Sequence, residues 1–176
     1  MPRPILPIAA AVVGLAVVAS VAVGVPHLQR RMRETEAVYE LARLVRSASV
    51  YYVKPRAGAD GTRMACQFPP GTIRTHLANS CCDPRVGDDG LCNPLKIEWN
   101  RTLWHTLHWQ IREPHAFIYA YEASGTFGDA RLTVSAYGDT DCDGEFSTFR
   151  FIAQGDPKAR ADDCVLDGAP RFEAIE

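Results

Sequence analysis

The N-terminal part of this chain lacks charge over an unusually long stretch. No Asp, Glu, Lys or Arg occurs from Ile5 to Val25, and most residues there are Ala, Val, Ile, Leu or Gly. As a helix this stretch is about 30 Å long, which matches the hydrocarbon core of a bilayer. Backbone groups in lipid must pair within their own segment, so such a stretch is helical. The sequence therefore predicts a transmembrane half-helix over residues 1–27.

A cleaved secretory signal is the alternative interpretation of this segment. Arg3 precedes the apolar run, and Val17-Val18-Ala19 resembles a weak cleavage site. The apolar part of a signal peptide is usually about 7 to 15 residues long, which is shorter than the run seen here. We therefore expect a retained, single-pass anchor.

Two features of the sequence predict opposite orientations of the anchor in the membrane. Three arginines follow the span, Arg30, Arg31 and Arg33, and the positive-inside rule would place them in the cytoplasm. The cysteines described below favour an oxidising compartment, and we give them more weight. The expected location is the bacterial inner membrane, with the C-terminal domain periplasmic or on the cell surface.

Glycine and proline are absent from Gln29 to Val53. A stripe of apolar residues recurs there with helical spacing: Val38, Leu41, Val45, Ala48 and Tyr52. Lys54-Pro55 ends the pattern, because the residue before proline disfavours the α region. Residues 28–54 are therefore expected to form the soluble half of one long helix.

The remaining chain divides into a loop and a sheet. Residues 55–98 are rich in Gly, Pro, Asp and Cys, have little periodicity, and predict a long connecting loop. Residues 99–176 carry short aromatic and β-branched runs typical of strands. The expected strands are Thr106–Arg112, His115–Glu122, Ala130–Tyr137 and Ser147–Ala153. The predicted fold class is α+β, with a long helix packed on a four-stranded antiparallel sheet and braced by disulfides.

The chain has six cysteines but no Cys-x-x-Cys pair. They are Cys66, Cys81, Cys82, Cys92, Cys142 and Cys164. An even number of cysteines behind an exportable segment predicts disulfides, and zinc is the competing interpretation, although these spacings fit no common zinc pattern. The favoured pairing joins Cys92 to Cys81 or Cys82. It also joins Cys142 to Cys164.

Motifs for catalysis and for nucleic-acid binding are missing. The chain has no phosphate-binding glycine loop, no Gly-x-Ser-x-Gly elbow and no His-Glu-x-x-His. It also has no basic stripe, and the net charge of the whole chain is −2. We therefore predict no enzymatic activity and no nucleic-acid partner.

The histidines and tryptophans have structural interpretations. On a strand, residues three apart point to opposite faces, so His105 and His108 are not expected to meet with His115 around a metal. The tryptophans are expected to fill the core between helix and sheet, and a patch that binds a partner is the alternative. They are Trp99, Trp104 and Trp109.

Several short elements resemble type IV pilins and the pseudopilins of type II secretion, in particular a myxobacterial group of pilin-like proteins. They are Val23–Leu28, Arg30–Glu36, Tyr51-Tyr52, Phe68-Pro69, Cys81-Cys82, Pro114–Phe117 and Gly138–Phe149. The resemblance spans nearly the whole chain and implies a non-enzymatic structural subunit or assembly partner. Its partners would be other pilin-like subunits or secretion and pilus assembly proteins. The alternative is a membrane-anchored extracytoplasmic binding module that is not assembled into a filament.

The processing motif departs from the family. Alignment on Pro26 places Pro4 where prepilins carry the glycine before the cleavage point, and Ala9 where they carry a glutamate. Pro fixes the backbone at that point. We therefore expect no cleavage by a prepilin peptidase, and no glutamate-guided docking into a filament.

A short acidic segment resembles the start of a calcium-binding loop. Its candidate ligands are Asp139, Asp141, Asp143, Glu145 and Ser147. Alternate carboxylates followed by Gly144 suit oxygen coordination of Ca²⁺. The twelfth position of such a loop is normally a bidentate Glu, and here it is Arg150. The sequence leaves two interpretations open, a solvated acidic turn and a calcium site, and calcium is the candidate cofactor.

Overall fold

The computed structural model describes residues 31–160 and 163–175. Contacts divide the chain into two compact units, Met1–Thr35 and Glu36–Glu176, and the fold described here is that of the second. The span predicted over residues 1–27 lies outside the described residues. Within the described ranges, no helix combines the length and the apolar character that crossing a membrane requires.

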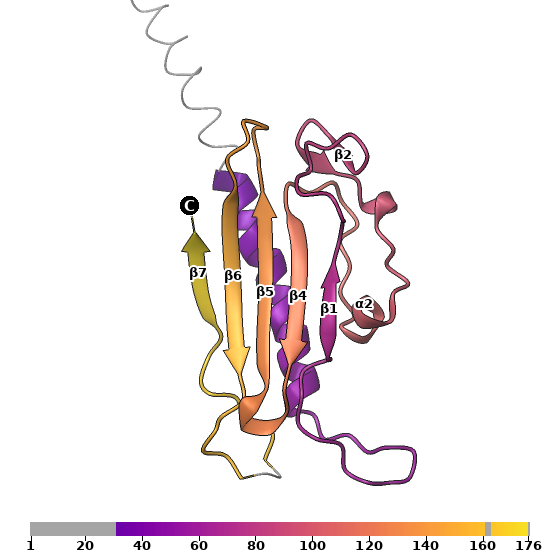
Figure 1. The fold of residues 1–176 in the computed structure, drawn as a ribbon, viewed down its shortest axis with the longest axis vertical. Coiled ribbons are helices and arrows are strands. Elements are labelled where there is room, and N and C mark those ends of the chain that lie inside the picture. The colour runs from indigo at the N-terminus through magenta and orange to yellow at the C-terminus, as the bar shows by residue number, and fades with distance from the viewer. Residues whose placement is uncertain (1–30, 161–162, 176) are drawn as a thin grey trace, which may run out of the picture. The chain divides into compact units, whose positions relative to one another are not determined.

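A helix covers residues 31–53, and its part from Glu36 onward lies across one face of the sheet (Figure 1). Its buried residues recur every three or four positions and pack into the same core as the sheet: Ala37, Leu41, Leu44, Val45, Ala48 and Tyr52. This spacing places them on one face of the helix. The helix ends before Pro55, which disfavours helical geometry at Lys54.

The main sheet is antiparallel and has five strands in the order β1-β4-β5-β6-β7. Their bounds are β1 Gly71–Arg74, β4 Ile118–Ser124, β5 Arg131–Gly138, β6 Ser147–Gln154 and β7 Arg171–Ile175. Leu132, Val134 and Ala136 of β5 are buried, and the residues between them are more exposed. This alternation is expected because successive side chains of a strand point to opposite faces.

The segment between β1 and β4 carries the smaller elements and lies beside β1 (Figure 1). They are β2 Gly87–Asp88, β3 Leu91–Cys92, the 3₁₀ turn Pro94–Lys96 and α2 Thr102–Thr106, and a further 3₁₀ turn, Phe127–Asp129, precedes β5. The hydroxyl of Ser47 donates a hydrogen bond to the carbonyl of Leu107, which attaches the first helix to this segment.

The C-terminal end of the first helix is held against the sheet by a close contact. The Tyr52 hydroxyl donates to the Phe127 carbonyl at 2.9 Å. A side chain at Gly155 would place its Cβ 2.0 Å from that same carbonyl oxygen. A glycine is required at this position because the backbone before β5 and the backbone after β6 approach so closely.

The predicted fold class is wrong. It expected four strands and a helix that spans the membrane in its first half. The described chain has a five-stranded antiparallel sheet, a separate two-stranded sheet and two α-helices, and the longer helix, over residues 31–53, is not apolar enough for a span. The sequence pattern missed β1 because this strand is short and lies in a Gly- and Pro-rich stretch. It missed β7 because this strand is only five residues long and directly follows Gly168 and Pro170.

The predicted strand at residues 106–112 is also wrong. Leu107, Trp109 and Ile111 are buried and the residues between them are exposed, as in a strand. The described chain nevertheless pairs this segment with no strand, because β1 occupies the free edge of β4. The alternation instead reflects an extended segment whose apolar side chains cover the core.

All six cysteines form disulfides: Cys66–Cys164, Cys81–Cys92 and Cys82–Cys142. The prediction that Cys92 bonds to Cys81 or Cys82 is confirmed, with Cys81 as the partner, and the predicted link between Cys142 and Cys164 is wrong. These two cysteines precede and follow β6, respectively, and the eight residues of β6 span about 26 Å. A disulfide requires Cα atoms within about 7 Å, so each of the two bonds to a closer segment.

Candidate functional site

A groove of about 620 Å³ lies between the first helix and the segment from Trp99 to His115. The helix contributes Glu36, Glu40 and Arg43 to it. This volume falls within the range of about 300 to 1,000 Å³ that is typical of ligand pockets. Sequence reasoning missed the groove, because it forms between two segments that are about 60 residues apart in the chain.

Aromatic rings make up much of one wall. Trp104 lies 5.0 Å from Trp109 and 6.1 Å from Trp99, measured between ring centroids. Trp104 and Trp109 are buried, whereas Trp99 is half-buried and donates its indole N–H to the Pro94 carbonyl. The expectation that the tryptophans fill the core is therefore correct for two of them, and the third lies at the groove surface.

Carboxylates line the opposite wall. The Glu36 carboxylate accepts hydrogen bonds from the Tyr119 hydroxyl at 3.1 Å and from the Ala116 backbone N–H at 3.2 Å. Glu40 is buried and accepts from the Arg43 guanidinium at 2.8 Å. Burial, reinforced by the neighbouring Glu36, raises the pKa of Tyr119 well above its usual value. These bonds fix the carboxylates in place and give the groove an acidic side.

The described chain does not bring His105 and His108 together with His115. His105 lies in α2 and His108 just after it, so neither belongs to a strand, and both are exposed. Among the described residues, possible metal-ligand clusters include neither of them. His115 has a different neighbour, His76, which sequence reasoning did not single out. His76 follows β1, a strand that the sequence pattern did not predict, so nothing near it in the sequence marked it as part of a site.

His76 makes the stability of the protein sensitive to acid. Burial, then the neighbouring His115 and Lys96, lower the pKa of His76 to about 4. An unfolded histidine has a pKa of about 6.5, so between pH 6.5 and 4 the unfolded state binds a proton that the native state does not. As the pH falls from 6.5 to 4, the free energy of unfolding should therefore decrease by up to about 3 kcal/mol. Above pH 6.5, His76 should not make the free energy of unfolding depend on pH.

Denaturant titrations from pH 7.5 to 4, in the presence of chelator, test this expectation. His76→Gln should flatten the pH profile relative to the wild type, because the amide does not titrate. His105→Gln is the matched control, since that histidine is exposed, and its profile should follow the wild type. Parallel profiles for His76→Gln and wild type would contradict the prediction.

The acidic turn between β5 and β6 brings three of the five predicted calcium ligands together. Carboxylate oxygens of Asp139, Asp141 and Asp143 lie within 4.8 Å of one another, and Glu145 and Ser147 are not part of this cluster. Asp139 is buried, and its carboxylate accepts the backbone N–H groups of Asp143 at 3.1 Å and of Gly144 at 3.0 Å. These two hydrogen bonds to the Asp139 carboxylate hold the backbone of the turn in place.

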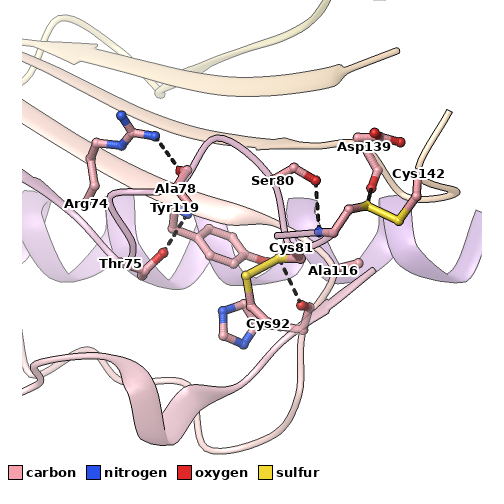
Figure 2. The surroundings of a disulfide bond; sticks show 12 residues. Arg74, Thr75, Ala78, Ser80, Cys81, Cys92, Ala116, Tyr119, Asp139 and Cys142 are labelled. Carbon is pink, nitrogen blue, oxygen red and sulfur yellow. Dashed lines mark hydrogen bonds between the residues drawn. A yellow bond between two sulfur atoms is a disulfide. The ribbon is translucent and has the colours of Figure 1, made fainter. Parts of the chain in front are cut away.

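A disulfide braces the same turn. Cys142 is bonded to Cys82, whose sulfur lies 3.3 Å from the Asp139 carbonyl oxygen (Figure 2). Cys142 has a φ of 61° and Gly144 a φ of 93°, so the chain reverses sharply between them. Arg150, at the position of the missing twelfth ligand, lies in β6 and pairs with Glu173 of β7 at 3.9 Å.

Calcium should stabilise the protein weakly through this turn. A ligand that binds only the folded state raises the melting temperature by mass action, and a site without its bidentate Glu should have a Kd of about 10⁻⁴ to 10⁻³ M. The melting temperature should therefore be higher in millimolar calcium than in chelator. Asp141→Asn should abolish the gain and Asp88→Asn should preserve it, and equal melting temperatures in both conditions would leave an ordinary acidic turn.

Comparison of the chain with protein-family models, with curated proteins and with solved structures found no match.

Proposed function

We propose that this chain is a non-enzymatic structural subunit or assembly partner of a type IV pilus or a type II secretion system. The proposal begins from the sequence resemblance and is supported by one feature of the first helix. Tyr39, Val50 and Val53 expose 62, 55 and 44% of their surface, although this helix also buries an apolar face. An amphipathic helix normally presents polar residues to solvent, so three large apolar side chains exposed on this helix offer a surface for a partner.

The geometry of the helix places these residues on one side. Tyr39 and Val50 are 11 residues apart, which is close to three turns, and Val53 lies nearly one turn further on. The residues that pack on the sheet, such as Leu44 and Ala48, lie on the opposite side. A subunit with one helix face on its own sheet and another face turned outward can assemble with copies of itself through that outer face.

The other expectations fit the same proposal. Three disulfides favour an oxidising compartment, hence a periplasmic or surface location, for the domain from Glu36 onward. The predicted anchor would hold the domain at the membrane. With Pro4 and Ala9 in the processing positions, an unprocessed assembly partner or a tip component suits this chain better than a major filament subunit.

A paired substitution tests the assembly surface. Tyr39→Asp with Val50→Asp, in the full chain in membranes, should abolish cross-linked multimers, because each carboxylate buried in an apolar contact costs several kcal/mol. Both residues are exposed, so stability should change by no more than about 0.5 kcal/mol per site. Leu95→Asp is the control, an exposed apolar residue outside the helix. Multimers that persist in the paired variant would rule out this surface.

A binding module that does not assemble is the second candidate, and the groove favours it. Its rings and carboxylates, including Trp99 and Glu40, suit a partner segment that carries a cationic group. Electron microscopy of surface filaments in cells with and without the chain separates the two functions. Loss or shortening of filaments would support the structural subunit, and unchanged filaments would support the binding module.

A further inference from the structure

Two buried histidines from different parts of the chain meet beside a disulfide. His76 follows β1 and His115 precedes β4, and they expose 5 and 1% of their surface. Their rings stack at 22° with centroids 6.1 Å apart. Because β1 and β4 are neighbours in the sheet, the fold itself brings these rings together.

The third member of the cluster is Cys92. Its sulfur and one ring nitrogen from each histidine lie within 4.8 Å of one another. The backbones of Cys92 and His115 exchange hydrogen bonds of 2.7 and 3.3 Å, which fixes this pair of residues side by side. Cys92 is fully buried and bonded to Cys81, which is buried as well (Figure 2).

Both histidines present an unused nitrogen. Nδ1 of His115 lies 3.1 Å from the Glu113 carbonyl oxygen, which can only accept, so Nδ1 carries the proton and Nε2 keeps its lone pair. Nε2 of His115 and Nε2 of His76 are buried and have no hydrogen-bond partner within the part of the chain that the structure describes. Such atoms are rare because leaving them unpaired costs about 1 to 3 kcal/mol each. Burial also lowers the pKa of both histidines, which favours the neutral rings that metals bind.

We propose that His76, His115 and Cys92 hold a zinc ion in the thiol form of the chain, with Cys81 as the fourth ligand, and that the Cys81–Cys92 disulfide replaces this ion on oxidation. Two imidazoles and two thiolates form one of the common sets of structural zinc ligands. A carbonyl that receives the other ring N–H, as Glu113 does for His115, is a frequent outer partner of a metal-bound histidine.

The distances and charges suit this assignment. Ligand atoms on one tetrahedral zinc lie about 3.3 to 3.8 Å apart. The site is completed when side-chain rotations bring the ring nitrogens and the Cys92 sulfur about 1 Å closer, and when reduction of the disulfide lets the two sulfur atoms move apart. The nearby Lys96 opposes a cation at His76. The two thiolates offset it, because their two negative charges neutralise the zinc.

The exchange between the two states is a thiol–disulfide reaction. One zinc-bound thiolate attacks a small disulfide oxidant and releases one thiolate of that oxidant. The second cysteine thiolate then attacks the mixed disulfide, which closes the Cys81–Cys92 bond and releases the other thiolate. The protein loses two electrons to the oxidant, and zinc leaves as Zn²⁺ once its two sulfur ligands are gone.

The test uses the full chain with Cys81→Ser, which frees Cys92 and leaves the other two disulfides intact. Cobalt(II) is the probe, because tetrahedral cobalt bound to thiolate absorbs in the visible and near ultraviolet. One cobalt per chain should bind with a thiolate band, and Zn²⁺ should displace it. Adding His76→Gln or His115→Gln should weaken zinc binding more than about tenfold. Adding His105→Gln should not change it.

Two results would overturn the proposal. One is a folded Cys81→Ser chain, with a single free thiol, that gives no thiolate band. The other is an oxidised wild-type chain that binds zinc as tightly as the variant, because the sulfur would then not be a ligand.

A second measurement applies if Cys81→Ser does not fold. During oxidative refolding of the reduced wild-type chain, zinc should slow closure of the Cys81–Cys92 bond more than about tenfold relative to chelator. Equal slowing in a chain with both histidines replaced by Gln would contradict the site.

Discussion

Replacing Cys66 and Cys164 together with alanine should lower the free energy of unfolding by about 4 to 5 kcal/mol. The bond joins positions 98 residues apart, and a cross-link that closes a loop of about 100 residues removes close to 4.7 kcal/mol of chain entropy from the unfolded state. Cys66 is buried in the main core and Cys164 packs against it. The bond also holds the chain between β6 and β7 against the start of the sheet domain.

The matched control is the pair Cys81 and Cys92, which are only 11 residues apart. The same relation gives about 3 kcal/mol for so short a loop, so the two double variants should differ by about 2 kcal/mol. Denaturant unfolding under non-reducing conditions, with chelator present, measures both. Equal losses in the two variants would show that native contacts, and not loop length, set the contribution of each disulfide.

Trp104→Ala should destabilise the domain by about 3 to 5 kcal/mol. Its ring is 1% exposed and contacts Trp99 and Trp109, so truncation leaves a large cavity in the core. Trp104 also borders the groove, so water can enter part of the space, which places the loss toward the lower end of this range. Thermal and denaturant unfolding followed by circular dichroism give the loss directly.

Leu95→Ala serves as the comparison, because Leu95 also lies between β1 and β4 and is 90% exposed. Its loss should not exceed about 0.5 kcal/mol. If Trp104→Ala costs no more than Leu95→Ala, the segment from Trp99 to His115 does not pack on the core as described. In that case this segment would not form a wall of the groove either.

The sequence predicted the residues of the acidic turn as one site, but it did not predict the histidine pair. Asp139, Asp141 and Asp143 were predicted together because they are neighbours in the chain, and local geometry is enough to gather them. His76 and His115 were not, because they are 39 positions apart and meet only through the pairing of β1 with β4. The same holds for Cys82 with Cys142, whose contact depends on the position of the β5–β6 turn.

Local sequence determined what depends on near neighbours. The end of the first helix before Pro55 follows from local preferences, and so do the strands β4, β5 and β6 and a short-range bond from Cys92 to one of the adjacent residues Cys81 and Cys82. Only the tertiary structure decided the strands β1 and β7, the two longer disulfides, the groove and the histidine pair. These features depend on the pairing of β1 with β4, and on the positions of the two ends of β6 in the sheet. Contacts between distant segments arise when the whole core is buried, and no single stretch of sequence carries that information.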